Sequence, residues 1–351
     1  MNHFEPKKAV LVYRPGSDKA LYNLLKYSRV DIETVLLAEF DLPAGERGRF
    51  TDLNPSLVFT DDIDEALGTD ADMLLWTREV FEAEDDYRLW REIILAAVEK
   101  GKNIYNMAKL PRIEAEPAIV KAISEKGVKY WSASDHALSM GEVDIFGPYP
   151  DLKIKAKVVT LLGTGRRCGK FTTTKLLRTR LTDAGIKAAE LATEPYGLLT
   201  GADYMIIPHV MPMWRSAPAI KNGLLHLDRT LEPDVILVSS QSGFRADPHT
   251  APGRCGGVVA YAIAAASAPD VAVLCTTFES IPSVTGEIRS IEFLLDCPVL
   301  GVSVKGRGHT DEEIDGVLRE LHKATDLPAF DPVRSPEGVD SLVRAIVRMV
   351  G

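Results

Sequence analysis

One stretch decides the fold of the second half of this chain: KVVTLL at residues 157–162, followed by GTGRRCGKFTT at residues 163–173. The first six residues are typical of a buried strand, and a helical pattern runs from Lys170 to about Asp183. A glycine-rich loop between a strand and a helix is the context that a phosphate-binding loop requires. Its glycines let backbone N–H groups converge on an anion, and the helix N-terminus adds a partial positive charge.

We therefore expect this loop to bind the phosphate groups of a cofactor. Lys170 supplies a full positive charge, and Arg166 and Arg167 add donors that suit phosphate oxygens. The alternative is a plain strand–turn–helix corner that binds nothing. The predicted cofactor-binding residues are Gly163, Thr164, Gly165, Arg166, Arg167, Cys168, Gly169, Lys170, Phe171, Thr172 and Thr173.

The spacing of the loop departs from the strict GxxxxGK[ST] pattern of a phosphate loop. Five residues separate Gly163 from Gly169, and Phe171 stands where a serine or threonine normally binds magnesium. Thr172 or Thr173 could take that role one or two residues later. We therefore expect phosphate binding more firmly than magnesium binding.

Short apolar runs alternate with helical patterns on both sides of the loop. Before it the runs lie at residues 9–13, 34–38, 57–60, 73–76 and 103–107, and after it at 188–193, 204–207, 235–238, 271–275 and 299–304. This rhythm predicts parallel strands joined by helical crossovers. Breaker residues gather at 146–151, where a domain boundary is expected. We predict a doubly wound parallel sheet over residues 1–150 and a P-loop α/β domain over residues 151–351.

Composition limits the classes of partner. The chain has 351 residues, with 41 Lys and Arg against 50 Asp and Glu, a formal net charge of −9. Such an acidic chain is a poor nucleic-acid binder, because binding requires cations that neutralise phosphates. No run of about 18 apolar residues predicts a membrane span, and the polar start does not resemble a signal peptide. We expect a cytoplasmic homo-oligomer with a small-molecule substrate.

The four cysteines support the same compartment. They lie far apart and form no CxxC motif, so we interpret them as reduced thiols rather than disulfides or a zinc site. We also predict no resident metal. The cysteines are Cys168, Cys255, Cys275 and Cys297.

An acid that holds magnesium is hard to find near the loop. The strand at 235–238 ends in Ser239-Ser240-Gln241-Ser242-Gly243, and Asp234 lies at its opposite end. Glu194 or Asp247 could substitute. A phosphate-bearing ligand that is bound rather than cleaved therefore fits better, and coenzyme A is such a ligand.

The first domain lacks a dinucleotide fingerprint. Its first strand is followed by Arg14-Pro15-Gly16-Ser17 rather than GxGxxG. Without those glycines a pyrophosphate cannot approach the backbone closely. We expect this domain to act as a scaffold or to bind the acceptor.

Polar residues follow several strands of the second domain, at the edge where open parallel sheets bind ligands. A histidine there could act as a general base, an arginine could hold a carboxylate or an oxyanion, and each could equally be structural. The predicted catalytic residues are His209, His249, Gln241 and Arg245. The predicted substrate-binding residues are Thr193, Glu194, Gly197, Arg215 and Asp247.

The loop and the segments from about Val158 to Gly306 resemble a bacterial and archaeal family of unknown function. That family joins an N-terminal Rossmann-like domain to a C-terminal P-loop NTPase-like domain, and it includes D-glutamate N-acetyltransferases. The loop also resembles that of dethiobiotin synthetase. The resemblance implies this two-domain fold and an acetyl-CoA cofactor.

Two departures from that family concern the acceptor pocket. The family usually has ATGQTG and EGQGS where this chain has ATEPYG at 192–197 and SSQSG at 239–243. Thr193, Gly197 and Gln241 carry over, and the glutamate of the second motif does not. The resemblance therefore implies the same role for the loop, but it does not imply the same acceptor.

Three functions follow from these observations. The first is transfer of an acetyl group from acetyl-CoA to the amine of a small amino acid similar to D-glutamate. The second is an ATP- and magnesium-dependent kinase or ligase that activates a carboxylate. The third is a sensor that binds a phosphate-bearing ligand without turnover, because a fold does not by itself fix chemistry.

Overall fold

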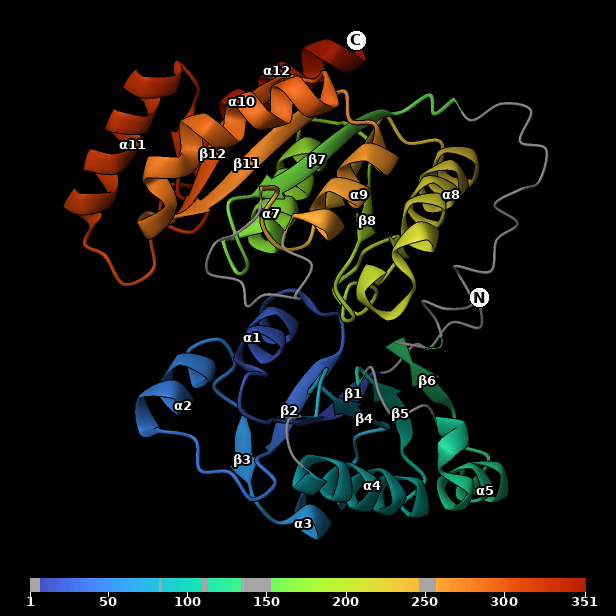
Figure 1. Cartoon of the computed structure of the whole chain (residues 1–351). Coiled ribbons are helices and arrows are strands. Elements are labelled where there is room, and N and C mark those ends of the chain that lie inside the picture. The colour runs from blue at the N-terminus through green and yellow to red at the C-terminus, as the bar shows by residue number, and fades with distance from the viewer. Residues whose placement is uncertain (1–6, 82–83, 109–112, 134, 136–152, 246–256) are drawn as a thin grey trace. The chain divides into compact units, whose positions relative to one another are not determined.

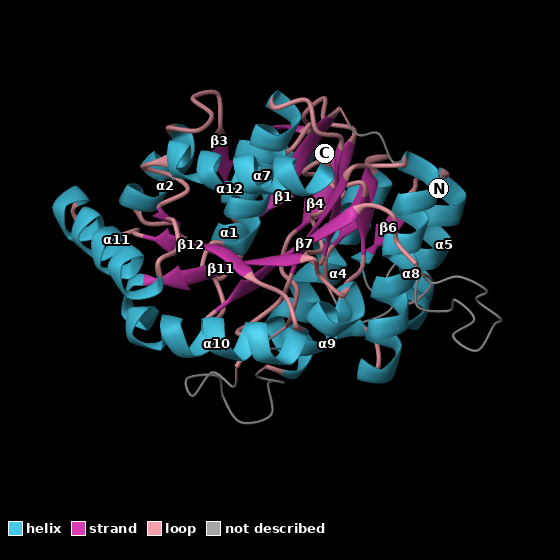
Figure 2. Ribbon diagram, turned by 90° about the horizontal axis from the view of Figure 1, so that it is seen from above, coloured by secondary structure: helices cyan, strands magenta, loops and turns pink. Residues whose placement is uncertain are grey.

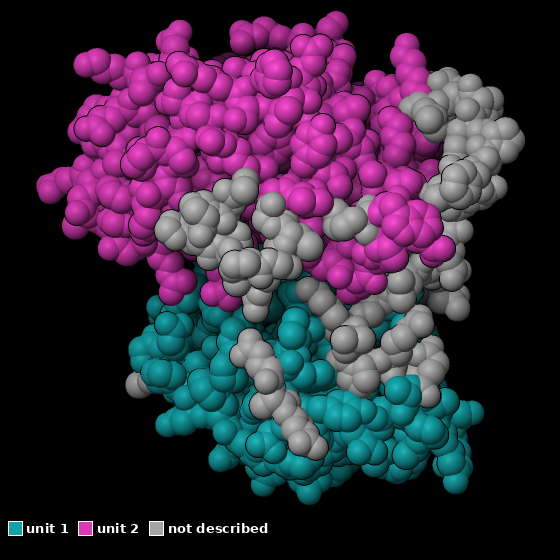
Figure 3. Space-filling view, in the orientation of Figure 1, with its two compact units in different colours: residues 1–139, 194–201 teal, residues 140–193, 202–351 magenta. Residues whose placement is uncertain are grey.

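The computed structural model describes residues 7–81, 84–108, 113–133, 135, 153–245 and 257–351. The chain forms two compact units (Figure 3). Unit 1 comprises Met1–Ser139 and Glu194–Gly201, and unit 2 comprises Met140–Thr193 and Ala202–Gly351. The domain boundary expected at residue 150 falls among residues 136–152, outside the described part of the chain.

Unit 1 is a parallel α/β sheet in the order β3-β2-β1-β4-β5-β6 (Figure 1). Its strands are β1 (Lys8–Val12), β2 (Asp31–Leu36), β3 (Val58–Thr60), β4 (Met73–Trp76), β5 (Asn103–Asn106) and β6 (Tyr130–Ser132). Its helices are α1 (Asp18–Tyr27), α2 (Ala44–Thr51), α3 (Ile63–Leu67), α4 (Glu84–Glu99) and α5 (Pro117–Lys126), with the short helix η1 (Ile113–Ala115).

Helices cover both faces of this sheet, so its central strands are apolar along their whole length. Val10 and Trp76 pack against Trp90 and Ile94 of α4, while α1 lies on the opposite face. The strand order places its reversal point between β1 and β4, as in doubly wound folds. The predicted doubly wound sheet is confirmed.

Unit 2 is a second parallel sheet, in the order β13-β12-β11-β7-β10-β8-β9. Its strands are β7 (Lys157–Gly163), β8 (Ala188–Ala192), β9 (Tyr204–Met205), β10 (Val235–Ser239), β11 (Val271–Thr277), β12 (Val299–Lys305) and β13 (Ala329–Phe330). Its helices are α7 (Lys170–Asp183), α8 (Met213–Leu231), α9 (Val258–Ser267), α10 (Val284–Leu295), α11 (Asp311–Thr325) and α12 (Asp340–Val350). Short helices η2 (Pro208–Val210), η3 (Phe278–Ser283) and η4 (Pro336–Val339) link them.

Figure 2 shows α7 and α12 on one face of this sheet and α9 and α10 on the other. In one apolar cluster, Leu177 of α7 and Ile346 of α12 pack with residues of the strands. In a second cluster, Ile291 of α10 packs with residues of the strands. β7 lies in the middle, between β11 and β10. Because all these strands are parallel, the loop after β7 meets the ends of β10 and β12 at one edge of the sheet.

None of the described helices has both the length and the apolar character that a membrane span requires.

A buried ion cluster joins α7 to β8. The Lys175 ammonium lies 2.7 Å from the Glu190 carboxylate, and the Arg178 guanidinium lies 3.4 Å from the same carboxylate. The Lys175 side chain is 7% exposed and that of Glu190 is 1% exposed. Burial lowers the pKa of Lys175, although Glu190 opposes this shift. The cluster fixes the helix that carries the loop onto the sheet.

We predict that Lys175→Ala lowers the free energy of unfolding by about 3 kcal/mol, because the Glu190 charge stays buried with one cation fewer. Urea denaturation of the full chain measures the change. Glu92→Ala is the control, because it breaks the exposed Arg88–Glu92 pair and should change stability by less than about 0.5 kcal/mol. Equal losses for the two variants would contradict a structural role of the cluster.

Candidate phosphate-binding site

Gly163 ends β7 and leaves room for the loop to fold back over it. A Cβ at this position would lie 2.5 Å from the Cys168 sulfur and 2.9 Å from the Lys170 nitrogen. Both distances are shorter than any real Cβ contact, so only glycine fits with those side chains in place. Because Gly163 has no side chain, the Lys170 ammonium can lie beside its backbone.

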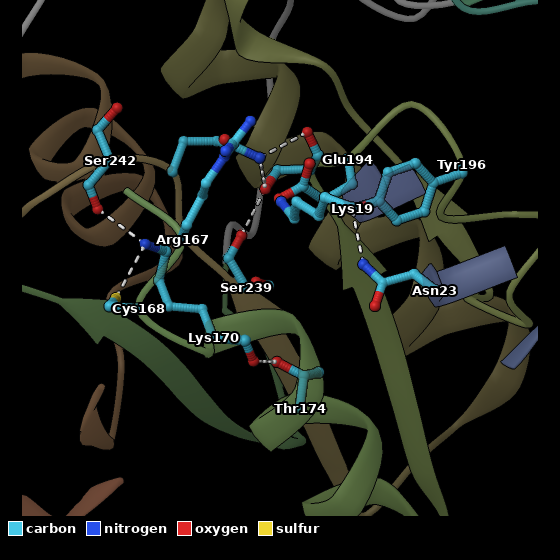
Figure 4. A network of polar contacts seen from close by, with 12 residues as sticks. Lys19, Asn23, Arg167, Cys168, Lys170, Thr174, Glu194, Tyr196, Ser239 and Ser242 are labelled. Atoms are coloured by element: carbon cyan, nitrogen blue, oxygen red, sulfur yellow. Dashed lines mark hydrogen bonds and ion pairs between the residues drawn. The ribbon is translucent and has the colours of Figure 1, made fainter. Parts of the chain in front are cut away.

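Two backbone carbonyls and, at 3.6 Å, the Cys168 sulfur hold the Lys170 ammonium, and Figure 4 shows this group turned toward Ser242 and Cys168. The nitrogen donates to the carbonyl oxygens of Gly165 and Ser242, each at 2.9 Å. Gly165 belongs to the loop itself and Ser242 to the segment after β10. Lys170 is 8% exposed, so a bare ammonium here has to be paired by polar groups. Neutral carbonyls leave its positive charge uncompensated.

The segment after β10 packs closely on the loop. The Phe244 N–H donates to the Gly163 carbonyl at 2.8 Å, and a Cβ on Gly243 would lie 2.8 Å from the Thr164 oxygen. The Thr164 N–H donates to the Cys275 carbonyl of β11 at 3.0 Å. The loop is thus fixed on both sides by neighbouring strand ends.

The remaining backbone N–H groups of the loop are available. Arg167 and Gly169 have φ values of +56° and +99°, the left-handed conformation that turns successive N–H groups toward one side. Within the described residues, the N–H groups of Gly165, Arg166, Arg167 and Gly169 donate no hydrogen bond. With the N-terminus of α7 behind them, they form an anion-binding arrangement.

Cys168 is a packed residue of the loop. Its thiol is 1% exposed and donates to the Gly165 carbonyl at 3.2 Å. Cys275 of β11 is also buried, and burial together with Cys168 raises its pKa to about 12. A protonated, buried thiol is unreactive, so Cys275 supports the sheet by packing, and Cys168 is buried in the same apolar cluster.

The residues after Lys170 do not reproduce a magnesium site. Phe171 is buried, and the Lys175 ammonium lies 5.1 Å from the centre of its ring. The Thr173 hydroxyl is fully buried and bonds to the Gly169 carbonyl and the Ser303 hydroxyl. Thr172 is partly exposed. Of the two threonines proposed for magnesium, only Thr172 keeps its hydroxyl outside that buried network.

Hydroxyl and amide groups, rather than an acid, end β10. Ser239 and Ser240 are 2% and 0% exposed, and their hydroxyl oxygens have no partner among the described residues. The Gln241 amide donates to the carbonyl and hydroxyl of Thr193 at 3.0 Å and 2.9 Å. The Thr193 hydroxyl in turn donates to the Ser239 carbonyl at 2.7 Å. The structure therefore brings the predicted Thr193 and Gln241 together.

Asp234 lies at the other end of β10, where its carboxylate accepts from the Lys187 N–H at 2.8 Å. Across the described residues, no three His, Cys, Asp or Glu side chains are grouped so as to hold a metal ion.

Glu194 and Gly197 belong to unit 1, although Thr193 directly before them belongs to unit 2. The Glu194 carboxylate lies 2.7 Å from the Lys19 ammonium, as Figure 4 shows, and Glu194 is 8% exposed. The Tyr196 hydroxyl accepts from the Asn23 amide at 3.0 Å. The Glu194 charge is therefore neutralised within unit 1 by a lysine whose side chain is 34% exposed.

The side chains of the remaining predicted residues are exposed, contact other elements, or lie outside the described chain. His209 is exposed after β9, which is three strands from β7, or roughly 14 Å at ordinary strand spacing. The Arg215 guanidinium lies 4.8 Å from the Trp214 ring centre. The Arg245 guanidinium lies 2.7 Å from where a Cβ of Gly286 would be, so it packs against α10. His249 and Asp247 lie outside the described residues.

Lys305 is a site residue that the sequence analysis missed. It ends β12, and its ammonium donates to the Arg167 carbonyl of the loop at 2.9 Å. The sequence carries a signal for it, because a lysine at a strand end followed by Gly306-Arg307-Gly308 is a turn at the same sheet edge. Only the strand order shows that this edge adjoins the loop.

Two family models match the chain. Residues 144–343 match the model described as "Domain of unknown function (DUF1611_C) P-loop domain". Residues 44–136 match the model described as "Domain of unknown function (DUF1611_N) Rossmann-like domain". Together they confirm a Rossmann-like unit followed by a P-loop unit. A comparison with curated proteins finds no match.

Among solved structures, a DUF1611 family protein from Anabaena variabilis is similar over 97% of this chain and 99% of its own, with 18% identity and a TM-score of 0.79. A nucleotide-binding protein from Archaeoglobus fulgidus in complex with ADP covers 54% of this chain and 88% of its own, with 14% identity and a TM-score of 0.33. Cobyrinic acid a,c-diamide synthase from Mycobacterium smegmatis, with a bound ATP analog and magnesium, is similar over 55% of this chain and 95% of its own. The identity is 15% and the TM-score is 0.38. The first likeness supports the fold of the whole chain, and the other two are too weak to extend to function.

We predict that Gly163→Ala weakens binding of inorganic diphosphate at least about tenfold, because the new methyl group displaces the Lys170 ammonium. Isothermal titration calorimetry measures the affinity. Gly316→Ala on α11 is the control, because its Cβ would meet no atom within 4 Å. If Gly163→Ala keeps the circular dichroism spectrum and the affinity of the original chain, Gly163 does not set the position of the lysine.

Proposed function

The chain belongs to the DUF1611 family, and we propose that its loop at residues 163–170 binds the diphosphate of a nucleotide-containing cofactor. One observation carries the proposal: a buried Lys170 ammonium held by neutral carbonyls lies beside loop N–H groups that donate to no described residue. Such a site offers a full positive charge and several donors to an incoming anion. ADP, ATP and coenzyme A all contain an adenosine diphosphate group.

Coenzyme A in a thioester is the cofactor that we favour. The strand next to β7 ends in Ser239 and Ser240 rather than in an acid, and Phe171 replaces the usual magnesium-binding hydroxyl. Glu194 is paired with Lys19. These features support a diphosphate that is held by cations and N–H groups instead of by magnesium, and a diphosphate that is bound without being cleaved requires no metal.

The reaction we propose is acyl transfer to the amine of a small amino acid, as in the D-glutamate N-acetyltransferases that the loop resembles. The amine attacks the thioester carbonyl carbon, a C–N bond forms and the C–S bond breaks. The proton of the amine passes to a base, and the leaving thiolate takes up a proton to give free coenzyme A. Backbone N–H groups near the loop would stabilise the tetrahedral oxyanion.

The base and the acceptor pocket complete this proposal. Thr193 and Gln241 form a fixed polar pair after β8 and β10, which suits them to orient an acceptor. His209 is the described histidine among the proposed bases, and it is exposed to solvent. The changed ATEPYG and SSQSG segments favour an acceptor other than that of the typical family members.

A thermal-shift comparison tests the ligand. Coenzyme A and acetyl-CoA should stabilise the chain without magnesium, and a ligand at about 100 times its dissociation constant contributes about 2.7 kcal/mol. Lys170→Ala should abolish the shift, while Lys323→Ala, an exposed lysine on α11, should keep it. Stabilisation by ATP with magnesium but not by either coenzyme would instead favour a kinase or ligase.

Release of free thiol from acetyl-CoA, measured over a panel of D- and L-amino acids, tests the reaction. We expect release that depends on one class of amino acid and falls at least about a hundredfold in Lys170→Ala, because the cofactor is no longer positioned. Binding of acetyl-CoA with no thiol release for any acceptor would contradict acyl transfer and favour a sensor.

A further inference from the structure

We propose that Lys305 and Arg307, at the end of β12, form a second anion subsite beside the loop, and that it takes the 3′-phosphate of coenzyme A. This inference rests on the proposed function and deepens it, because it names a chemical group that ADP and ATP lack. The subsite lies wholly within unit 2.

The position of Lys305 follows from the sheet. β12 pairs with β11, and β11 pairs with β7, so the end of β12 lies two strands from the start of the loop. The Lys305 ammonium donates to the Arg167 carbonyl at 2.9 Å, and its Cβ lies 3.8 Å from where a Cβ of Gly169 would be. One of its three N–H donors is used in this bond. The other two remain for a ligand at the mouth of the loop.

The cations of the loop and of the turn after β12 form no ion pair in the described part of the chain. Among the described residues, no salt bridge involves Arg166, Arg167, Lys305 or Arg307, although the chain as a whole is acidic. The carboxylate of Asp331, a buried acid directly after β13, accepts from the N–H groups of Gly306, Val333 and Arg334. Its charge is therefore committed to the backbone.

Electrostatics at Lys305 agree with this geometry. Burial lowers the pKa of Lys305, Arg307 and Arg167 lower it further, and Glu279 and Cys168 oppose them. Two neighbouring cations thus repel the Lys305 charge, while the opposing acid, Glu279, is largely exposed and lies 3.9 Å from His309. A bound phosphate would relieve this repulsion and gain hydrogen bonds to charged donors.

The opposite side of the loop has different chemistry. The segment after β10 carries the Gln241 amide, which is paired with Thr193, and neither of these side chains is charged. When the diphosphate of the cofactor occupies the loop, the charged end and the neutral end of the cofactor can therefore be told apart by the two sides of the loop. The phosphate-bearing ribose lies toward β12, and the neutral thioester arm lies toward β10 and the proposed acceptor residues.

Titration calorimetry with coenzyme A and with dephospho-coenzyme A tests the subsite. We expect the original chain to bind coenzyme A at least about tenfold more tightly, because only this ligand carries the 3′-phosphate. Lys305→Ala and Arg307→Ala should each reduce that ratio toward one by weakening coenzyme A alone. Arg344→Ala, an exposed arginine of α12, is the matched control and should keep the ratio.

Two failures can be told apart. Equal affinities of the original chain for the two ligands, both lost in Lys170→Ala, would overturn the subsite and leave the loop proposal standing. Binding of neither ligand would overturn the proposed function itself. A preference for coenzyme A that survives in both Lys305→Ala and Arg307→Ala would place the 3′-phosphate elsewhere and would also overturn the subsite.

Discussion

The position of the Lys170 ammonium depends on the missing side chain of Gly163. A Cβ there would lie within 3 Å of the Lys170 nitrogen and of the Cys168 sulfur, so both side chains would have to leave their observed positions. The carbonyls of Gly165 and Ser242 then hold the ammonium without cancelling its charge. A buried cation that is solvated by dipoles alone attracts an anion, and the loop N–H groups lie beside it.

The strand, loop and helix over residues 157–183 could be predicted from the sequence, because local patterns alone determine them. The sequence predicts a strand at residues 157–162 and a helix from Lys170 to about Asp183, and the structure has Lys157–Gly163 and Lys170–Asp183. The lack of an acid after β10 was also visible, since it depends on the five residues 239–243. Local sequence thus defines the strand, the loop and the helix, and it shows that no acid stands at residues 239–243.

Contacts between distant parts of the chain could not be predicted in this way. The Lys19–Glu194 pair joins residues 175 positions apart, and the Lys305–Arg167 contact joins residues 138 apart. Nothing near Glu194 indicates that residues 194–201 belong to the first unit, because a tertiary partner decides it. The candidate role of Lys305 likewise depends on the strand order, which places the end of β12 near the loop. The loop could be predicted from the sequence, whereas the Lys305–Arg167 contact beside it required the fold.

The most direct test of whether this loop binds a diphosphate is a titration of the isotopically labelled full chain with coenzyme A. The amide chemical shifts are recorded during the titration. We expect the largest changes at the N–H groups from Gly165 to Lys170, because hydrogen bonds to phosphate oxygens shift the signals of their donors. Smaller changes should follow at Lys305 and Arg307. Saturable binding with unchanged loop signals, or no binding of coenzyme A, ADP or ATP at all, would contradict the account.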